Sequence, residues 1–327
     1  MPGLLKSLGL DIYAFLDADT DEAKTFTTYL GYWISLAEHI EQLYGDPPFM
    51  ALHAELRSRG LARLSGKPIA GDPDRLRSVL LNAWSSELAL YLVDLQNAER
   101  LWLGNQWAQV QSYYATSRAA TAWLLARDGT APETHASLLR AMSAQVTTAR
   151  LYPCPWSLTC SALKPSTVYG GFPSPPIATS NLTAMADPYD RCAMMLRTTR
   201  DRDVRRQVEQ VKRDLKKNRA PNGEYARQDA RYRASTLFDF AWRTRTRSNY
   251  GDPAMFYVGT LTPERSRDYA AAIRTVTSAT MFVFEAMIAQ KAKKVLDEAA
   301  THFTARDRAR ISDAVIVPRL QTLGVLV

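Results

Sequence analysis

The feature that most constrains the fold of this chain is the helical spacing of apolar side chains in its last quarter. Six residues recur at intervals of four and three, which places them along one face of a single long helix: Tyr269, Ile273, Val276, Thr280, Val283 and Met287. Thr262-Pro263-Glu264 is a helix start signal, and the pattern could extend to His302. Because such a helix must bury its apolar face against other helices, the sequence predicts an all-α, multi-helix bundle.

Helix start and stop signals also mark the N-terminal half. A helix capped within residues 19–21 should end near Tyr44, before Gly45 and the Pro47-Pro48 pair. A short helix over residues 48–59 follows.

The next stretch predicts three more helices. Asp72-Pro73 is a strong start signal for a helix that should reach Leu103, where Gly104-Asn105 should break it. A second helix spans residues 106–126, and Thr134 caps a third that runs to about residue 149.

The region from Leu151 to Asp187 interrupts this pattern. It is rich in Pro, Ser and Thr and contains Gly170-Gly171. Trp156, Tyr169 and Phe172 are too apolar for a disordered linker, so we expect an ordered but irregular Pro/Gly-rich insertion. The sequence shows no Val- and Ile-rich pattern strong enough for a large sheet.

Helices resume at Pro188, with one predicted over residues 191–200, one over 204–218 and one over 229–247. Asn249-Tyr250-Gly251-Asp252-Pro253 should end the last of these.

We therefore divide the chain into four parts. An N-terminal helical extension covers residues 1–72, and the first part of the helical core covers 73–150. The insertion occupies 151–187, and a basic helical segment with the C-terminal long helices completes the core over 188–327.

Positive charge is concentrated in one segment. The chain has a net charge of +8, whereas Arg191 to Arg247 alone contain 17 Lys and Arg against 7 Asp and Glu, a net of +10. A basic segment of this kind favours an acidic partner, most commonly nucleic acid, although a solvated surface kept for solubility has the same composition.

The sequence gives little support for a disulfide-bonded, metal-binding, cofactor-dependent or membrane protein. Cys154, Cys160 and Cys192 form no disulfide framework and lack a fourth zinc ligand, which fits a reducing cytoplasm. We expect no metal and no cofactor, because the known phosphate-loop, nucleophile-elbow and metalloprotease motifs are missing from the sequence. No signal peptide and no membrane span are predicted, so the expected location is the cytoplasm.

The residues between Asn105 and His135 carry a recognisable pattern. It comprises an aromatic and small-residue helix, a Leu-Leu end, a glycine turn and a Thr-His start: Tyr113-Tyr114-Ala115, Ala119-Ala120, Leu124-Leu125, Gly129 and Thr134-His135. This pattern resembles the HEPN superfamily of prokaryotic helical domains, most clearly over Ser86 to Val146 and more weakly over Trp242 to Asp252. The alternative is an unrelated helical bundle in which Tyr113, Tyr114 and Trp123 are core residues.

The resemblance implies a helical bundle that often forms a homodimer. Many HEPN proteins are metal-independent endoribonucleases of toxin–antitoxin, defence and CRISPR systems, and they use an Arg followed four to six residues later by a His. The His moves a proton for the attacking 2′-OH of RNA, and the Arg stabilises the charge that develops on the phosphate oxygens.

The four histidines do not match that motif. His39, His53 and His302 have no Arg in the ten preceding residues, and His135 follows Arg127 with seven residues between them, one too many. His135 also falls where Thr-His looks structural in the family.

By context, the best match is Arg243 and Arg245 followed by Tyr250, which stands where the His would be. A phenol with a pKa near 10 is a poor base at pH 7, but it can bind a phosphate or stack on a base. The resemblance therefore makes Arg243, Arg245 and Tyr250 the catalytic candidates. Alternatively, this segment is a helix stop in which Tyr250 packs inward. Arginines spaced two apart cannot share one helix face.

The nucleic-acid-binding candidates are the cations of the predicted helix over residues 204–218, together with two polar residues near the helix stop: Arg205, Arg206, Lys212, Arg213, Lys216, Lys217, Arg247 and Asn249. They would contact the phosphate backbone independently of base sequence, although such charge runs are also common on solvated helix faces.

Three functions remain open on this basis. The preferred one is a nucleic-acid-binding, HEPN-like protein, with RNA favoured over DNA, that belongs to a prokaryotic defence or toxin system. The alternatives are a metal-independent HEPN endoribonuclease and a non-catalytic helical subunit for dimerisation or interaction.

Overall fold

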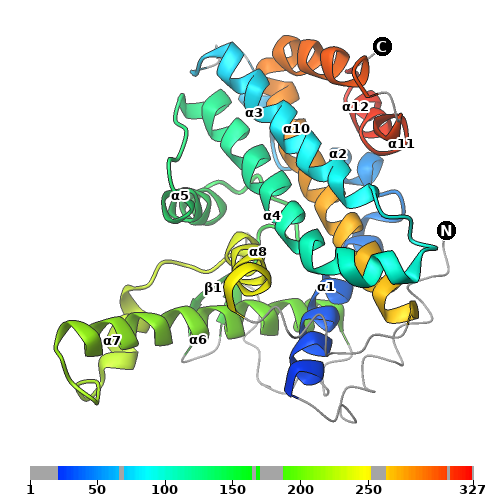
Figure 1. Cartoon of the computed structure of the whole chain (residues 1–327). Coiled ribbons are helices and arrows are strands. Elements are labelled where there is room, and N and C mark those ends of the chain that lie inside the picture. Colours follow the sequence, from blue (N-terminus) through cyan, green and yellow to red (C-terminus); the bar gives the residue numbers. More distant parts are fainter. Residues whose placement is uncertain are drawn as a thin grey trace.

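The fold is built around one long central helix. The computed structural model of the chain describes residues 21–65, 70–163, 167–169, 187–251, 263–307 and 310–325 (Figure 1). In these residues the chain is predominantly α-helical, which confirms the predicted class. Helix α10, Pro263–Thr304, packs against α4, Ala98–Asp128, and both pack against α3, Pro73–Leu88 (Figure 1).

The predicted helical face of α10 is the centre of the hydrophobic core. The apolar residues of its predicted stripe are buried, and the helix ends two residues beyond the predicted limit, with a non-helical kink at Ala292. By length and composition alone α10 could cross a membrane, since an 18-residue window has a mean hydropathy of 1.3. However, 78% of that window is buried inside the fold, as in the core helix of a helical bundle.

The N-terminal helices belong to the same core. Helix α1, Asp21–Tyr44, packs against α10 and also against the basic segment. Helix α2, Phe49–Ser58, packs on α10 and is followed by a 3₁₀ turn, Leu61–Leu64. The predicted stop at Gly45 is confirmed, since this residue has a φ of +78°. The proposed caps at residues 19 and 20 lie outside the described residues.

Two short helices near the C-terminus close the far end of the bundle (Figure 1). They are α11, Ile311–Val315, and α12, Val317–Thr322. Arg319 of α12 is fully buried and pairs with Glu87 of α3 at 2.5 Å and with Glu285 of α10 at 2.7 Å. This ion-pair network joins α12 to the two helices that it covers.

The predicted break at Gly104-Asn105 was wrong, because α4 runs through both residues and the chain breaks earlier, over residues 89–97. A β-carbon on Gly104 would lie 3.3 Å from the Val93 side chain, so the glycine permits close packing of the connection that precedes the helix. Asn105 is buried and donates a hydrogen bond to the Ser266 carbonyl at 3.1 Å. Tertiary packing thus explains the two residues that suggested a helix stop.

The basic segment also differs from the prediction. The two helices predicted over residues 191–200 and 204–218 are one helix, α6, Pro188–Asp214. Conversely, the helix predicted over 229–247 is divided into α7, Glu224–Arg231, and α8, Leu237–Thr246. Asp239 accepts hydrogen bonds from the Thr236 amide at 2.8 Å and from its hydroxyl, which starts α8 afresh.

A π-helical turn, Arg247–Gly251, follows α8, so helical backbone continues through Asn249 and Tyr250 of the predicted stop, while Asp252 and Pro253 lie outside the described residues. The other helix near this region is α5, His135–Thr148, which begins at the predicted cap Thr134. Figure 1 shows α6 and α7 extending away from the bundle, with α8 between them and the core.

The described part of the irregular insertion is ordered. Strands β1, Thr159–Ala162, and β2, Thr167–Tyr169, form an antiparallel pair, and Trp156 is buried with its indole N–H donating to Thr280 at 2.9 Å. Cys160 exchanges two backbone hydrogen bonds of 2.9 Å with Ser235, just before α8. Gly170-Gly171 and Phe172 lie outside the described residues.

Candidate nucleic-acid interface

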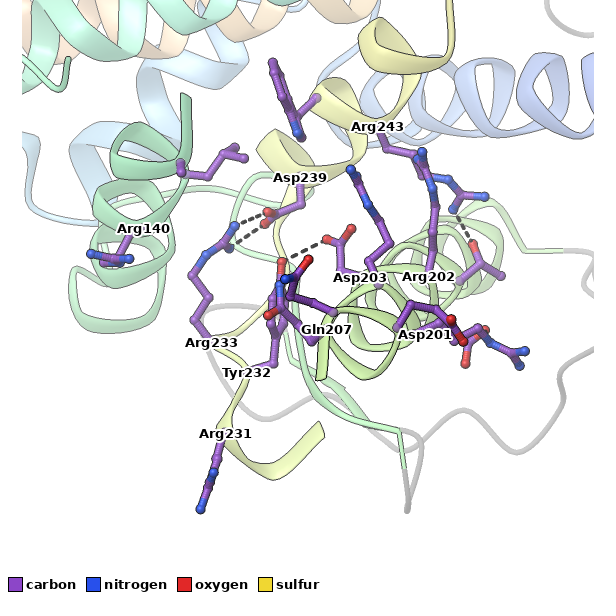
Figure 2. Close-up of a pocket in the computed structure, with 18 of the residues that line it drawn as sticks. Arg140, Asp201, Arg202, Asp203, Gln207, Arg231, Tyr232, Arg233, Asp239 and Arg243 are labelled. Atoms are coloured by element: carbon purple, nitrogen blue, oxygen red, sulfur yellow. Dashed lines mark hydrogen bonds and ion pairs between the residues drawn. The ribbon is translucent and has the colours of Figure 1, made fainter. Parts of the chain in front are cut away.

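A large cleft opens between α5, α6 and α8. Its volume is about 1340 Å³, and the described lining contains nine arginines and four carboxylates, an excess of five positive charges. The arginines come from α5, α6, α7, α8, the π turn and the connection between α7 and α8. Figure 2 labels five of the nine, which are Arg140, Arg202, Arg205, Arg206, Arg213, Arg231, Arg233, Arg243 and Arg247. The cleft is therefore a concave, strongly positive surface.

The carboxylates of the cleft are already paired with neighbouring residues. Arg233 forms an ion pair with Asp239, and Arg205 pairs with Asp201 at 2.9 Å. Asp203 accepts a hydrogen bond from the Tyr232 hydroxyl at 2.9 Å (Figure 2). Burial raises the pKa of Asp203, and the nearby Asp239 raises it further. Asp203 also lies close enough to Arg202 for their opposite charges to attract, so the four acids offset part, but not all, of the positive charge of the cleft.

Most arginines of the cleft form no ion pair with a described carboxylate, and three of these, Arg202, Arg206 and Arg243, lie close to one another. Arg243 instead donates hydrogen bonds to three hydroxyls, those of Tyr29 at 3.0 Å, Thr198 at 3.1 Å and Thr199 at 3.2 Å. Arg202 and Arg206 make no hydrogen bond or ion pair with the described residues. Arg202 is half-buried and points toward Arg243 (Figure 2).

These three charges influence one another. Burial lowers the pKa of Arg202, and the neighbouring cations Arg243 and Arg206 lower it further, whereas Tyr29 and Asp203 favour its charged form. A guanidinium nevertheless stays protonated in a protein. A group of close guanidinium ions that nearby carboxylates offset only in part is unfavourable by itself and is stabilised when an anion binds between them. This arrangement is chemically suited to a phosphate.

The continuity of α6 explains how its arginines meet. On a single helix Arg202, Arg206 and Arg213 share one face, because their spacings of four and seven correspond to about one and two turns. On α8 and its π turn, Arg243 and Arg247 are four residues apart, and their guanidinium carbons lie 5.3 and 5.8 Å from the centre of the Tyr29 ring.

A fully buried arginine fixes one wall of the cleft. Arg200 pairs with Asp229 at 2.7 Å and donates to the carbonyl groups of Asp229, Tyr232 and Arg233 at 2.6, 3.2 and 2.8 Å. It also donates to the Cys160 carbonyl at 3.1 Å. Arg200 thereby holds the connection between α7 and α8 against α6, which positions Tyr232 and Arg233 at the cleft.

Arg245 lies on the opposite face of α8, within a group of aromatic rings. Its guanidinium carbon is 4.9 Å from the ring centre of Trp242, 5.2 Å from that of Tyr250 and 5.5 Å from that of Tyr114. It donates to the Tyr114 hydroxyl at 2.9 Å, while its Nε has no hydrogen-bond partner. Arg245 is only 7% exposed and forms no ion pair with the described residues.

His135 belongs to the same aromatic cluster. Its ring centre lies 4.4 Å from that of Trp242, and its Nδ1 is 2.7 Å from the Tyr113 hydroxyl. Burial lowers the pKa of His135, and the cations Arg245 and Arg118 lower it further, so the imidazole is neutral at pH 7. Trp242 also lines the cleft, and the cluster therefore adjoins it.

The structure brings together five of the predicted site residues in the cleft: Arg205, Arg206, Arg213, Arg243 and Arg247. Lys212 does not line it and pairs with Glu209 at 2.8 Å, and Lys216, Lys217 and Asn249 also lie outside its lining. Arg245 and Tyr250 belong to the aromatic cluster instead. The alternative that Tyr250 packs inward was wrong, because this side chain is 73% exposed.

Other residues of the site were not selected from the sequence. Arg202, Arg140 and Trp242 line the cleft, and His135 lies in the adjoining cluster. The four-residue spacing of Arg202 and Arg206 was a usable signal, but the predicted helix break between residues 200 and 204 concealed it. The sequence did not predict that His135 and Arg245 lie in one cluster, because 109 intervening residues separate them.

Known proteins add no further constraint on the site. No family model, no curated protein and no solved structure matches the chain. The described residues contain no group of three or more His, Cys, Asp or Glu side chains placed to hold a metal ion.

Proposed function

We propose that the protein binds nucleic acid through the backbone phosphates, which occupy the arginine cleft. The observation that carries this proposal is the group Arg202, Arg206 and Arg243, which lacks carboxylate partners among the described residues. Guanidinium groups bind phosphate oxygens in a bidentate manner, and Arg243 is held in place for this by its three hydroxyl partners. RNA is the expected form because of the resemblance to HEPN domains, which also suggests a role in prokaryotic defence.

Two properties follow from contacts made only to the backbone. Binding should be largely independent of base sequence, and it should weaken steeply as salt increases, because each neutralised phosphate releases a counterion.

Fluorescence anisotropy with a labelled single-stranded RNA tests this proposal. We expect binding at low salt and a loss of about 10-fold or more in affinity for each of Arg202→Gln and Arg206→Gln, as expected when a charged hydrogen bond is removed. Neither arginine has a structural partner among the described residues, so both variants should fold. Arg75→Gln is the matched control, since Arg75 is exposed on α3 outside the cleft. Wild-type protein that does not bind at low salt would exclude the proposed function.

A second candidate function is a metal-independent endoribonuclease, which is favoured by the position of a histidine and an arginine in the aromatic cluster. His135 and Arg245 both lie against Trp242 and Tyr114, with His135 6.3 Å from the Tyr114 ring centre. A neutral imidazole can accept a proton from a 2′-OH, and a guanidinium can stabilise the resulting phosphorane. In this arrangement His135 would supply the base for which the sequence offered only Tyr250.

Incubation of RNA with the protein in excess chelator tests this second candidate. We expect cleavage that His135→Asn and Arg245→Ala abolish and that Arg75→Gln retains. Intact RNA after incubation with the wild-type protein would reject nuclease activity, and cleavage by both variants would reject this site.

A further inference from the structure

The aromatic cluster holds a feature that phosphate binding alone does not use. Tyr250 is 73% exposed, although it lies directly on the guanidinium of Arg245. The guanidinium of Arg245 therefore lies over the phenol ring, and most of the side chain is exposed to solvent. A large aromatic ring held in this way is a stacking surface.

Arg245 gives this surface its rigidity and its charge. The guanidinium lies among the rings of Trp242, Tyr114 and Tyr250, and a hydrogen bond ties it to the Tyr114 hydroxyl. Its buried Nε has no partner, and no carboxylate of the described residues offsets its charge. A buried, unpaired cation is costly unless an anion comes close.

The stacking surface is also connected to the cleft. Trp242 contacts Arg245 on one side and lines the cleft on the other, and Arg247, three residues before Tyr250, lines the cleft as well. A strand whose phosphates lie along the cleft could therefore place its next base on the exposed side chain of Tyr250.

We infer that Tyr250 is a base-stacking site, and that the ligand of the cleft is an unpaired nucleic-acid strand rather than a duplex. This inference rests on the proposed function and adds the class of ligand. In a duplex the bases are stacked on one another and their faces are not available to a protein side chain, whereas every unpaired base presents a face to an aromatic ring.

Three oligonucleotides of equal length test the inference: single-stranded RNA, a blunt RNA duplex and an abasic ribose-phosphate strand. We expect the wild-type protein to prefer the single strand over the duplex. Tyr250→Ala should weaken binding of the single strand by about 5- to 150-fold, the range for loss of one base–aromatic stack. Tyr250→Phe should retain wild-type affinity, because it keeps the ring. On the abasic strand all three proteins should bind equally.

The exposed Leu92, which is 71% exposed outside the cleft, provides a control as Leu92→Ala. Equal affinity of Tyr250→Ala and wild type for the single strand overturns the inference, as does an equal loss on the abasic strand or a preference for the duplex. In those cases the proposed function stands, since the oligonucleotides still bind. If the wild-type protein binds none of the three, the proposed function itself fails.

Discussion

At the scale of single residues, the arginines of this protein fall into two chemically different groups. Arg200, Arg233 and Arg319 are each neutralised by a carboxylate in the fold. Arg202 and Arg243 are held close together with only hydroxyl partners or none among the described residues. The first group stabilises the structure, and the second is available to a ligand. Composition alone does not distinguish these groups, because the difference lies in their tertiary partners.

Arg200 is the clearest member of the structural group. Replacing it with Met leaves Asp229 and several carbonyl groups buried without their donor, so we expect Arg200→Met to lower the free energy of unfolding by about 3–5 kcal/mol. Arg206→Gln, at an exposed position on the same helix, should change it by no more than about 0.5 kcal/mol. Urea denaturation followed by circular dichroism measures both. Equal stability of the two variants would show that the Arg200 network does not support the fold.

His135 should report the positive field of the aromatic cluster. Its pKa should lie below the ordinary value of 6.5, first because it is buried and then because Arg245 and Arg118 oppose its protonation. As the pH falls, His135 is therefore protonated at a higher pH in the unfolded chain than in the folded protein. Its contribution lowers the free energy of unfolding between about pH 6.5 and the lower pKa of the folded state.

An NMR titration of the imidazole resonances, assigned with His135→Asn, tests this expectation. Arg118→Gln, at an exposed position, should raise the His135 pKa. A value of 6.5 or higher in the wild-type protein, or no change in the variant, would contradict the assigned electrostatics.

At the scale of helices and strands, the sequence predicted those elements whose ends are set by local chemistry. Asp72-Pro73, Thr134 and Gly45 mark helix boundaries because caps and turns act within a few residues. The failures came where distant contacts decide. Gly104 lies inside a helix, where its missing side chain leaves room for Val93, and α8 starts anew where Asp239 binds the Thr236 amide.

The same limit applies to the site. Helix spacing correctly separated Arg245 from Arg243, since the two lie on opposite faces of α8. The contact between α6 and α8 at the cleft depends on packing between elements that are distant in sequence. The same is true of the contact between His135 and Trp242. Local patterns carry no information about such contacts.

Two glycines with similar backbone conformation allow a test at this scale. Gly129 at the end of α4 has a φ of +70°, and a β-carbon there would lie 2.7 Å from the Ala70 carbonyl oxygen. Gly223 before α7 has a φ of +73° with nothing within 4 Å. Gly223→Ala should therefore cost only about 1–2 kcal/mol of backbone strain.

We expect Gly129→Ala to cost about 1–3 kcal/mol more than Gly223→Ala, because it also forces α4 away from the start of α3. Thermal and urea unfolding of the two variants measure the difference. Equal losses would mean that the close approach of these two elements is not required.

At the scale of the whole molecule, the fold consists of a helical bundle with a hydrophobic core and a charged arm formed by α6 and α7, which extends from it. Helices α1, α3, α4 and α10 share one core, which α6 joins only through its first half, up to Leu196, and Leu215 just beyond the end of α6 is 48% exposed (Figure 1). The cleft lies where this arm meets α5 and α8. Of the basic segment Arg191 to Arg247, eight arginines and four carboxylates line this concave surface, so part of the segment's positive charge is gathered there.

The homodimer implied by the resemblance to HEPN domains stays a prediction. Sedimentation equilibrium should give twice the monomer mass of 36.6 kDa. A dimer that binds no nucleic acid would favour the third function, a non-catalytic interaction subunit, and a monomer would argue against the HEPN-like assembly.

The salt dependence of single-stranded RNA binding tests the central claim, that phosphates occupy the cleft, most directly. Each phosphate contact contributes about −0.7 to the slope of log affinity against log salt concentration for single strands. The double variant Arg202→Gln/Arg206→Gln should therefore have a slope shallower than that of the wild type by about 1.4, while Arg75→Gln keeps the wild-type slope. A double variant with the same slope as the wild-type protein would place the phosphates elsewhere and contradict the claim.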